Sequence, residues 1–251
     1  MRKIVLLIAA LSVLLSCKTK LIVHDFKADN IPNYQNISTI DSSIVNFVQP
    51  YSAELDREMH EVIAESSVEL IKKKPESLLT NYLSDLILHE GQMFASRYPG
   101  RPIPDAAFLN YGSIRINLPK GKITVGKIFE MMPFENEIVI LKLKGEDLWK
   151  MADKIAENEG DCVAGMKLTI KDGKVETFEI NNKPVNRGIN YWLVTIDYVA
   201  NGGDDMTMFQ NRETIINTGI KLRDCFIEHM QNEYDAGRTI SPKLDGRIMY
   251  E

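Results

Sequence analysis

Cysteine and histidine are scarce in this sequence, and their scarcity argues against several kinds of site. The 251 residues include three cysteines and four histidines. Cys162 and Cys225 have no neighbouring Cys or His at metal-ligand spacing, which argues against a zinc site built on them. The histidines form no H-x-H or H-E-x-x-H pattern, which argues against a histidine-rich two-metal centre. The sequence leaves open whether Cys162 and Cys225 form a disulfide.

The sequence also has no excess of positively charged residues. The chain has 30 Lys and Arg against 35 Asp and Glu, a formal net charge of -5, so it lacks a basic field for a nucleic-acid backbone. We therefore expect no nucleic-acid partner. The short run Lys72-Lys73-Lys74 is typical of a solvated helix end. Neither a Walker loop nor a G-x-S-x-G elbow is present.

The apolar run near the start of the chain is too short to cross a bilayer. It extends from Ile4 to Leu15, follows Arg2-Lys3 and leads into Leu14-Leu15-Ser16-Cys17, which resembles a bacterial lipobox. In such lipoproteins the cysteine carries lipid. We therefore expect residues 1–17 to be a lipoprotein signal peptide, with Cys17 anchoring an exported chain to the bacterial cell envelope, at the outer membrane or on the periplasmic face. The alternative is a plain secretory leader with an incidental cysteine.

The rest of the chain has the composition of an ordinary globular protein, with 44% hydrophobic and 26% charged residues. Residues 18–42 are polar and show neither helical nor strand periodicity, so we expect a flexible tether there. Residues 43–251 alternate between apolar runs and amphipathic segments without a strict repeat. We predict one α+β domain, layered, with a mixed sheet and flanking helices.

The elements are predicted from periodicity and turn signals. Pro50 is expected to interrupt the first helix. The expected helices cover 44–59, 77–88, 146–155 and 218–234. The expected extended segments cover 61–70, 106–109, 137–143, 166–170, 175–180 and 191–196.

The stretch Tyr191 to Asp204 combines a buried-type strand with a turn of little side-chain bulk, Asn201-Gly202-Gly203. Tyr198 offers a flat ring and Asp204 a carboxylate beside that turn. Together they could hold a flat base and the hydroxyls of a sugar. An ordinary hairpin corner is the alternative interpretation of the same residues.

Several motifs, in this order, resemble the C-terminal domain of the 5'-nucleotidase family over about Val45 to Phe209. They are Glu76-Ser77-x-Leu79-x-Asn81, Asn110-x-Gly112-x-x-Arg115, Pro133-Phe134-x-Asn136, Gly165 and Tyr198-x-x-Asn201-Gly202-Gly203-Asp204. The resemblance implies a domain that holds the nucleoside part of a nucleotide. In the family, hydrolysis belongs to a metallophosphatase domain that carries two metal ions.

The resemblance implies that Phe134 and Tyr198 stack on the two faces of a base, which is a mode of recognition that tolerates several bases. Asp204 would accept hydrogen bonds from the ribose hydroxyls. Considered separately, Phe134 could be a core residue and Tyr198 an ordinary strand aromatic. The family usually has Phe where this chain has Tyr198.

The same resemblance assigns further substrate contacts. Arg115 would meet phosphate with its planar guanidinium, Asn110 would add an amide contact, and Gly165 would let backbone approach the base. Asn136 and Gly203 complete the substrate-binding motifs. As alternatives, Arg115 could form a surface ion pair and Asn110 a turn.

These expectations combine into one leading hypothesis, an exported lipoprotein that forms the substrate-binding half of a split 5'-nucleotidase. It would have no catalytic residue, metal or cofactor of its own, and a divalent metal pair would lie on a separate metallophosphatase chain. Pro75 and Lys74 stand where the family often has a phosphate-binding arginine. The alternatives are a lipoprotein that captures nucleosides or nucleotides without catalysis, and a structural module whose site has decayed.

Overall fold

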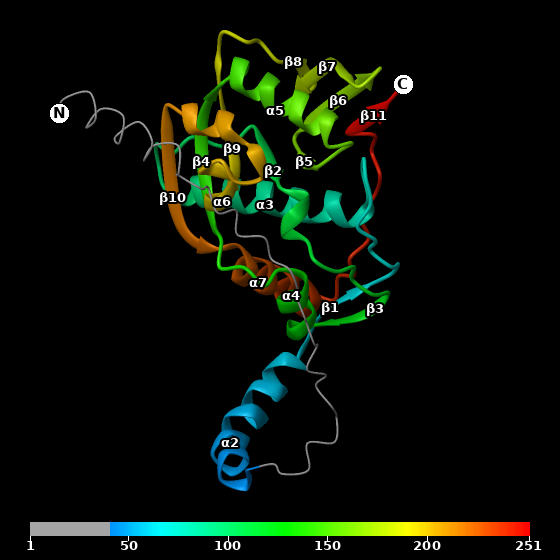
Figure 1. The fold of residues 1–251 in the computed structure, drawn as a ribbon, viewed down its shortest axis with the longest axis vertical. Coiled ribbons are helices and arrows are strands. Elements are labelled where there is room, and N and C mark those ends of the chain that lie inside the picture. Colours follow the sequence, from blue (N-terminus) through cyan, green and yellow to red (C-terminus); the bar gives the residue numbers. More distant parts are fainter. Residues whose placement is uncertain (1–40) are drawn as a thin grey trace, which may run out of the picture. The chain divides into compact units, whose positions relative to one another are not determined.

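A computed structural model describes residues 41–251 (Figure 1). Residues from Val48 onward form one compact unit, and residues up to Phe47 are assigned to another. The expected signal peptide with Cys17, and the expected tether up to residue 40, lie outside the described residues. Among residues 41–251, no helix combines the length and apolarity needed to span a membrane.

Helices and strands are intermixed along the described chain. The helices are α2 (Ser42–Met59), α3 (Leu78–Arg97), α4 (Val125–Met131), α5 (Gly145–Glu157), α6 (Asp197–Ala200) and α7 (Leu222–Asp235). The strands are β1 (Val62–Ser66), β2 (Ala106–Leu109), β3 (Gly121–Thr124), β4 (Glu137–Lys144), β5 (Cys162–Ala164), β6 (Met166–Lys171), β7 (Lys174–Ile180), β8 (Lys183–Pro184), β9 (Asn190–Ile196), β10 (Thr214–Lys221) and β11 (Ile248–Tyr250). The α+β class is confirmed.

The central sheet has the strand order β10-β4-β9-β2-β5. β2 and β9 run parallel, whereas the other neighbouring pairs run antiparallel, so the sheet is mixed as expected. The carboxyl ends of parallel strands meet at one edge of a sheet. β4 starts at this same edge, because Ile138 pairs with Ile196 at the end of β9. The loops after β2 and β9 and the loop before β4 are therefore neighbours.

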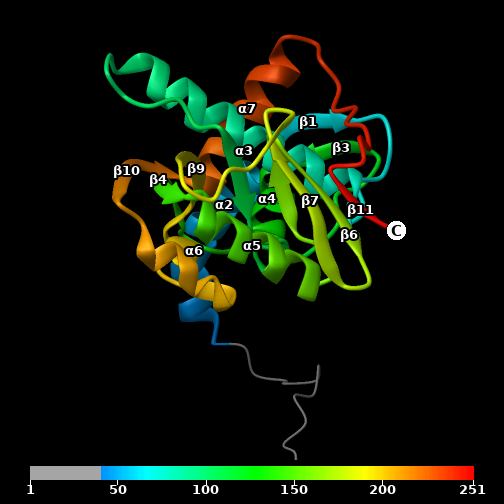
Figure 2. The ribbon, with the colours of Figure 1, turned by 90° about the horizontal axis from the view of Figure 1, so that it is seen from above.

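Helices cover the central sheet, and a smaller sheet packs against one of them, α5. α3 packs along β2, β5, β4 and β9, and α7 contacts α3, α4 and β1. α5 contacts both β4 and the hairpin of β6 and β7, where Trp149 meets Phe178 edge-to-face with ring centres 5.6 Å apart. Asp172 and Gly173 form the turn of this hairpin, and both have positive φ. Figure 2 shows β6, β7 and β11 side by side.

Three predictions about helix boundaries are wrong. α3, expected over 77–88, continues to Arg97. α2 continues through Pro50, which lies inside it. No residue of α2 is buried, so water can bind the carbonyl that Pro50 leaves without a partner. The helix expected from Thr218 begins at Leu222, because residues up to Lys221 belong to β10 and pair with β4.

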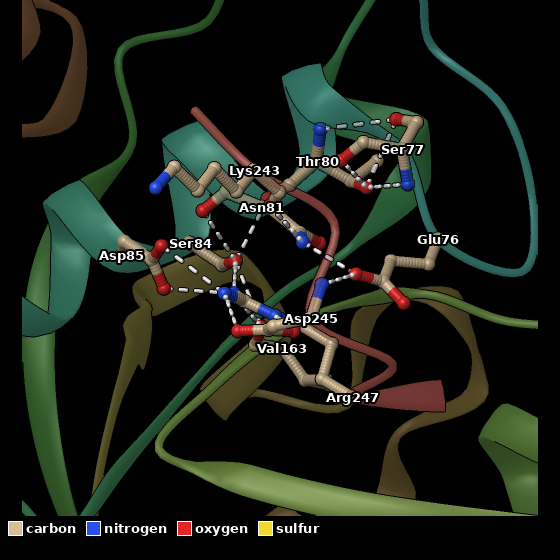
Figure 3. Close-up of polar contacts among 10 residues, drawn as sticks. All are labelled: Glu76, Ser77, Thr80, Asn81, Ser84, Asp85, Val163, Lys243, Asp245 and Arg247. Carbon is tan, nitrogen blue, oxygen red and sulfur yellow. Dashed lines mark hydrogen bonds and ion pairs between the residues drawn. The ribbon is translucent and has the colours of Figure 1, made fainter. Parts of the chain in front are cut away.

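The motif that begins at Glu76 holds the C-terminal segment in place (Figure 3). Ser77 caps α3 in a reciprocal capping box with Thr80. The Asn81 side chain donates to Glu76 Oε1 at 2.6 Å and to the Lys243 carbonyl at 3.0 Å. Asp245 donates its backbone N–H to the same Glu76 oxygen at 2.9 Å. This part of the motif therefore has a structural task in the chain.

The two described cysteines, Cys162 and Cys225, are buried free thiols. Cys162 lies in β5 and Cys225 in α7. Burial raises the pKa of both thiols above the ordinary value. The disulfide that the sequence left open is not formed in this structure.

Candidate functional site

Loops at the shared edge of β2, β9 and β4 enclose a cavity of about 250 Å³. Six of the eight substrate contacts expected from the sequence line it. The lining residues are Asn110, Gly112, Ser113, Arg115, Phe134, Asn136, Tyr198 and Asp204. The sheet topology explains this convergence, since these residues follow β2, precede β4 or follow β9.

Asp204 is the polar centre of this cavity. The Tyr198 hydroxyl donates to Asp204 Oδ1 at 2.9 Å, and the Asn110 amide donates to Asp204 Oδ2 at 2.6 Å. The hydroxyl of Ser113 in turn donates to Asn110 Oδ1. The hydrogen bond to Asp204 raises the pKa of Tyr198, so the phenol stays protonated and remains a donor at neutral pH.

Backbone conformation at the turn places the Asp204 carboxylate in the cavity. Asp204 has a φ of +50° and Gly202 a φ of +93°, both in the left-handed region. A non-glycine residue there costs on the order of 1–2 kcal/mol. Asp is among the few side chains that adopt this conformation with some regularity. The hydrogen bonds from Tyr198 and Asn110 help to offset the cost.

Two glycines give the polar groups and the aromatic ring the space they need. A Cβ atom on Gly112 would lie 2.9 Å from Asp204 Oδ2 and 3.3 Å from Asn110 Nδ2. A Cβ atom on Gly203 would lie 2.4 to 2.6 Å from three ring carbons of Tyr198. Gly203, an expected site residue, therefore lies directly against the Tyr198 ring.

Phe134 and Tyr198 expose 43% and 47% of their surface, so each ring can accept a stacking partner. The guanidinium of Arg115 lies 6.0 Å from the centre of the Phe134 ring. Phe134 stands on the loop between α4 and β4. The position of the ring at the cavity therefore depends on contacts between this loop and other elements.

Arg223, on α7, makes such contacts and was not identified from the sequence. Its buried guanidinium donates to the carbonyls of Met132 and Phe134 at 3.4 and 3.3 Å and pairs with the Glu135 carboxylate. It also lies 4.1 Å from the Phe129 ring centre. In sequence these partners are about 90 residues from Arg223, so no local pattern could indicate the contact.

A second hollow of about 340 Å³ adjoins the first and shares Gly112 and Asp204 with it. Its lining is mainly polar. The remaining lining residues are Lys74, Tyr111, Lys154, Asn158, Asp161 and Asp205. Lys74 and Lys154 line this hollow, and Lys72 lies beside it. Lys72 Nζ lies 3.8 Å and Lys74 Nζ 5.0 Å from the centre of the Tyr111 ring.

The prediction that the lysine run is a solvated helix end is wrong. The three lysines lie between β1 and α3, outside any helix. Lys72 Nζ donates to the Ile114 carbonyl at 2.6 Å, and Lys74 Nζ to the carbonyl of Asn158. Burial lowers the pKa of Lys72 from its ordinary value.

Asp161 is a buried carboxyl group behind this second hollow. Its Oδ1 accepts the backbone N–H of Tyr111 at 2.6 Å and that of Cys162 at 3.2 Å. Burial raises the pKa of Asp161 to about 6, although both hydrogen bonds favour the charged form. Asp161 therefore fixes the start of the loop that carries Tyr111 and Gly112. No role for Asp161 was predicted from the sequence.

Gly165 does not join the other expected site residues. It lines a different hollow, together with Asp85, Asn181 and Arg247. Its φ is +70°, and a Cβ atom there would lie 2.6 Å from the Asp105 carbonyl oxygen. In this structure the glycine permits a close approach of two backbone segments.

The residues that line the first cavity do not fit a metal pair. They include one carboxylate, Asp204, whose two oxygens already accept hydrogen bonds from Tyr198 and Asn110. Two-metal centres need several anionic or imidazole ligands around ions about 3.5–4 Å apart. The cavity is instead suited to binding and orienting a molecule with a flat ring, hydroxyl groups and an anionic end.

Comparisons with known proteins agree with this description. The family model "5'-nucleotidase, C-terminal domain" matches residues 62–211. A 5'-nucleotidase of Vibrio parahaemolyticus is 24% identical over 229 residues, which cover 86% of this chain and 38% of that protein. A trifunctional nucleotide phosphoesterase of Bacillus subtilis is 27% identical over 197 residues, 69% of this chain and 12% of that protein.

Solved structures show the same fold. The crystal structure of a 5'-nucleotidase precursor from Thermus thermophilus superposes with a TM-score of 0.67 at 27% identity and covers 83% of this chain. The match spans 42% of that protein. The chain thus corresponds to less than half the length of each of these three proteins.

Proposed function

Since the chain belongs to the family of 5'-nucleotidase C-terminal domains, we propose that it is the nucleotide-binding half of a split 5'-nucleotidase. A separate metallophosphatase chain would hydrolyse the nucleotide that this chain holds. The observation that carries the proposal is the convergence of Asn110, Arg115, Phe134, Asn136, Tyr198 and Asp204 on one cavity.

The base would lie between the rings of Phe134 and Tyr198. Each ring is about half exposed and lines the cavity, so stacking would remove apolar surface from water on both faces of the base. Stacking on an aromatic ring contributes about 1–3 kcal/mol per base and tolerates every base. The two rings would therefore contribute affinity without strong base preference.

The ribose hydroxyls would donate to Asp204. Each carboxylate oxygen has about two acceptor positions, and in this structure Tyr198 and Asn110 use one on each oxygen. One position per oxygen therefore stays available for a sugar hydroxyl. The two existing hydrogen bonds fix the carboxylate orientation before the ligand arrives, which lowers the entropy cost of binding.

The phosphate would extend toward the cationic side of the site. Arg115 lines the main cavity, while Lys74 and Lys154 line the adjoining hollow. A guanidinium binds phosphate oxygens in a bidentate manner, and lysines add point charges. The lysines would take over part of the task that an arginine before Glu76 often performs in this family.

Hydrolysis would take place on the partner. Two divalent ions held there would activate a water molecule and stabilise charge at phosphorus. The residues of this chain would bind the base and ribose and keep the phosphate in reach. Correct positioning of reacting groups can account for several kcal/mol of a catalysed barrier.

The proposal is tested by calorimetric titration of the purified full chain with adenosine, AMP and ATP in chelator, with phosphate release assayed on the same sample. We expect binding and no phosphate release. Phosphate release that survives repeated metal removal and repurification would contradict the proposal. Binding of nucleotide with no metallophosphatase partner in co-purification or activity complementation would favour a capture protein.

A pair of variants tests the site itself. Phe134→Ala should weaken AMP binding by about 5- to 100-fold, because stacking on one face of the base is lost. Tyr98→Ala is the control, since Tyr98 is a comparably exposed ring at the end of α3, away from the cavity lining. Equal affinity in Phe134→Ala and the parent would refute the stacking assignment and favour a structural module.

A further inference from the structure

Three metal-ligating side chains from two helices meet outside the nucleotide cavity. His89 and Glu90 lie on α3, and His229 lies on α7. One imidazole nitrogen of each histidine and one carboxylate oxygen of Glu90 lie within 4.8 Å of one another. The cluster shares no lining residue with the nucleotide cavity.

The side chains are open to an incoming ion. His89 is exposed and Glu90 and His229 are half-buried. They line a hollow of about 370 Å³ between α3 and α7. The imidazole rings stand edge-to-face with centres 5.5 Å apart, which brings their nitrogens toward a common point with the carboxylate. Small rotamer changes would bring all three donors to coordination distance.

The donor set matches a first-row transition ion better than Mg²⁺ or Ca²⁺. Imidazole nitrogen is a common ligand of Zn²⁺, Cu²⁺ and Ni²⁺, whereas Mg²⁺ and Ca²⁺ prefer oxygen alone. Two histidines and one glutamate make up a known zinc ligand set in which the fourth position belongs to water. The hollow leaves room for such a water.

The surrounding charge is negative on balance. Glu228 and Glu233 line the hollow together with the single cation Arg97. Glu233 forms an ion pair with Arg238, which reduces its contribution. Cys225 also lines the hollow, as a buried thiol. A divalent cation would therefore enter a site with an excess of carboxylates.

Glu90 and His229 interact directly. His229 Nδ1 lies 3.1 Å from Glu90 Oε1, and this hydrogen bond lowers the pKa of Glu90. A hydrogen-bonded pair that joins two helices would by itself explain these two residues. This hydrogen bond does not account for His89. The His89 side chain is exposed, and one of its ring nitrogens lies within 4.8 Å of the ligand atoms of Glu90 and His229.

We propose that His89, Glu90 and His229 form a Zn²⁺ site that links α3 to α7. The fourth ligand is water. Because α7 also carries Arg223, which holds the Phe134 loop, the ion fastens the helix that supports the nucleotide cavity. The site does not depend on the proposed nucleotide function, because its ligands take no part in the cavity.

The test is a calorimetric titration of the full chain with zinc chloride. The chain is made without a polyhistidine tag, treated with chelator and dialysed. We expect one strong Zn²⁺ equivalent, a higher Tm with Zn²⁺ in excess, and visible d–d bands when Co²⁺ replaces Zn²⁺. Both His89→Ala and His229→Ala should weaken Zn²⁺ binding by about 100-fold or more, since even loss of an outer partner costs 10- to 100-fold.

His60→Ala is the matched control, because His60 is an exposed histidine outside this hollow. It should bind Zn²⁺ as the parent does. His89→Ala removes an exposed side chain and should keep the fold, which circular dichroism checks. No Zn²⁺ binding by the parent at millimolar concentration would overturn the proposal. Unchanged Zn²⁺ affinity in both His89→Ala and His229→Ala would overturn it as well.

Discussion

Single residues at the cavity perform more than one task. Tyr198 offers a stacking face and also donates its hydroxyl to Asp204, while Gly203 lies against the ring. Asp204 accepts this bond from a left-handed backbone conformation. The ring and the hydroxyl of Tyr198 can therefore be tested separately.

Tyr198→Phe should bind AMP within about fivefold of the parent, because the ring is kept and a half-exposed hydrogen bond contributes only about 1 kcal/mol or less. Tyr198→Ala should bind about 5- to 100-fold more weakly, since one stacking face is lost. Calorimetric titration of both variants measures the difference. If Tyr198→Phe bound AMP as weakly as Tyr198→Ala does, the hydroxyl and not the ring would be responsible for the contribution of Tyr198 to AMP affinity.

Asp161 should make stability fall as pH rises through the weakly acidic range. Its pKa is about 6 in the folded chain, because of burial, and thus higher than the ordinary value of 3.8. Between these two values the folded state binds more protons than the unfolded state, so ionisation costs stability, by about 3 kcal/mol at neutral pH. Asp161→Asn keeps an acceptor oxygen for the Tyr111 and Cys162 N–H groups and cannot ionise.

Urea unfolding at several pH values between about 4 and 7 checks this expectation. The free energy of unfolding of the parent should fall relative to that of Asp161→Asn as the pH rises. If the free energies of unfolding of the two proteins changed in parallel with pH, Asp161 would not be the cause of the pH dependence.

At the scale of elements, the last strand is held by one arginine. Arg247, almost fully buried, pairs with Asp85 of α3 at 2.7 Å and with Asp245 at 2.8 Å, and donates to the Val163 carbonyl at 2.8 Å (Figure 3). β11 follows directly and pairs in parallel with β6. Arg247 therefore connects α3, β5 and the C-terminal strand.

Arg247→Ala should lower the free energy of unfolding by about 2–4 kcal/mol, because it removes one of the hydrogen bonds to the Val163 carbonyl and breaks a partly buried ion-pair network with Asp85 and Asp245. Arg238→Ala is the matched control. Its pair with Glu233 lies at the surface, so its loss should change the free energy of unfolding much less than the loss of Arg247 does. Equal losses in urea unfolding of the two variants would contradict the role given to Arg247.

At the scale of the whole molecule, the lipobox-like residues Leu14-Leu15-Ser16-Cys17 predict a lipid anchor at Cys17, which lies outside the described residues. The parent expressed in a Gram-negative host should fractionate with membranes and take up labelled palmitate. Cys17→Ser should take up no label and should leave the membrane fraction, because a thioether-linked lipid would no longer form. Membrane association and labelling that persist in Cys17→Ser would refute the lipobox interpretation.

The sequence by itself determined the family, the α+β class, most of the strands and six of the residues that line the cavity. These features depend on local patterns: alternation of apolar residues, turn residues and motifs in a fixed order. Phe134, Tyr198 and Asp204 could be named because each lies inside such a motif.

Tertiary structure alone decided which distant segments meet. β2, β4 and β9 bring three loops to one edge. Residues 218–221 belong to β10, which pairs with β4 up to Lys221, although their sequence also allows a helix. Arg223 reaches the Phe134 loop, and His89 and Glu90 approach His229 over 139 residues of chain. Contacts of this kind depend on how whole helices and strands pack, so they cannot be predicted from the local spacing of residues in the sequence.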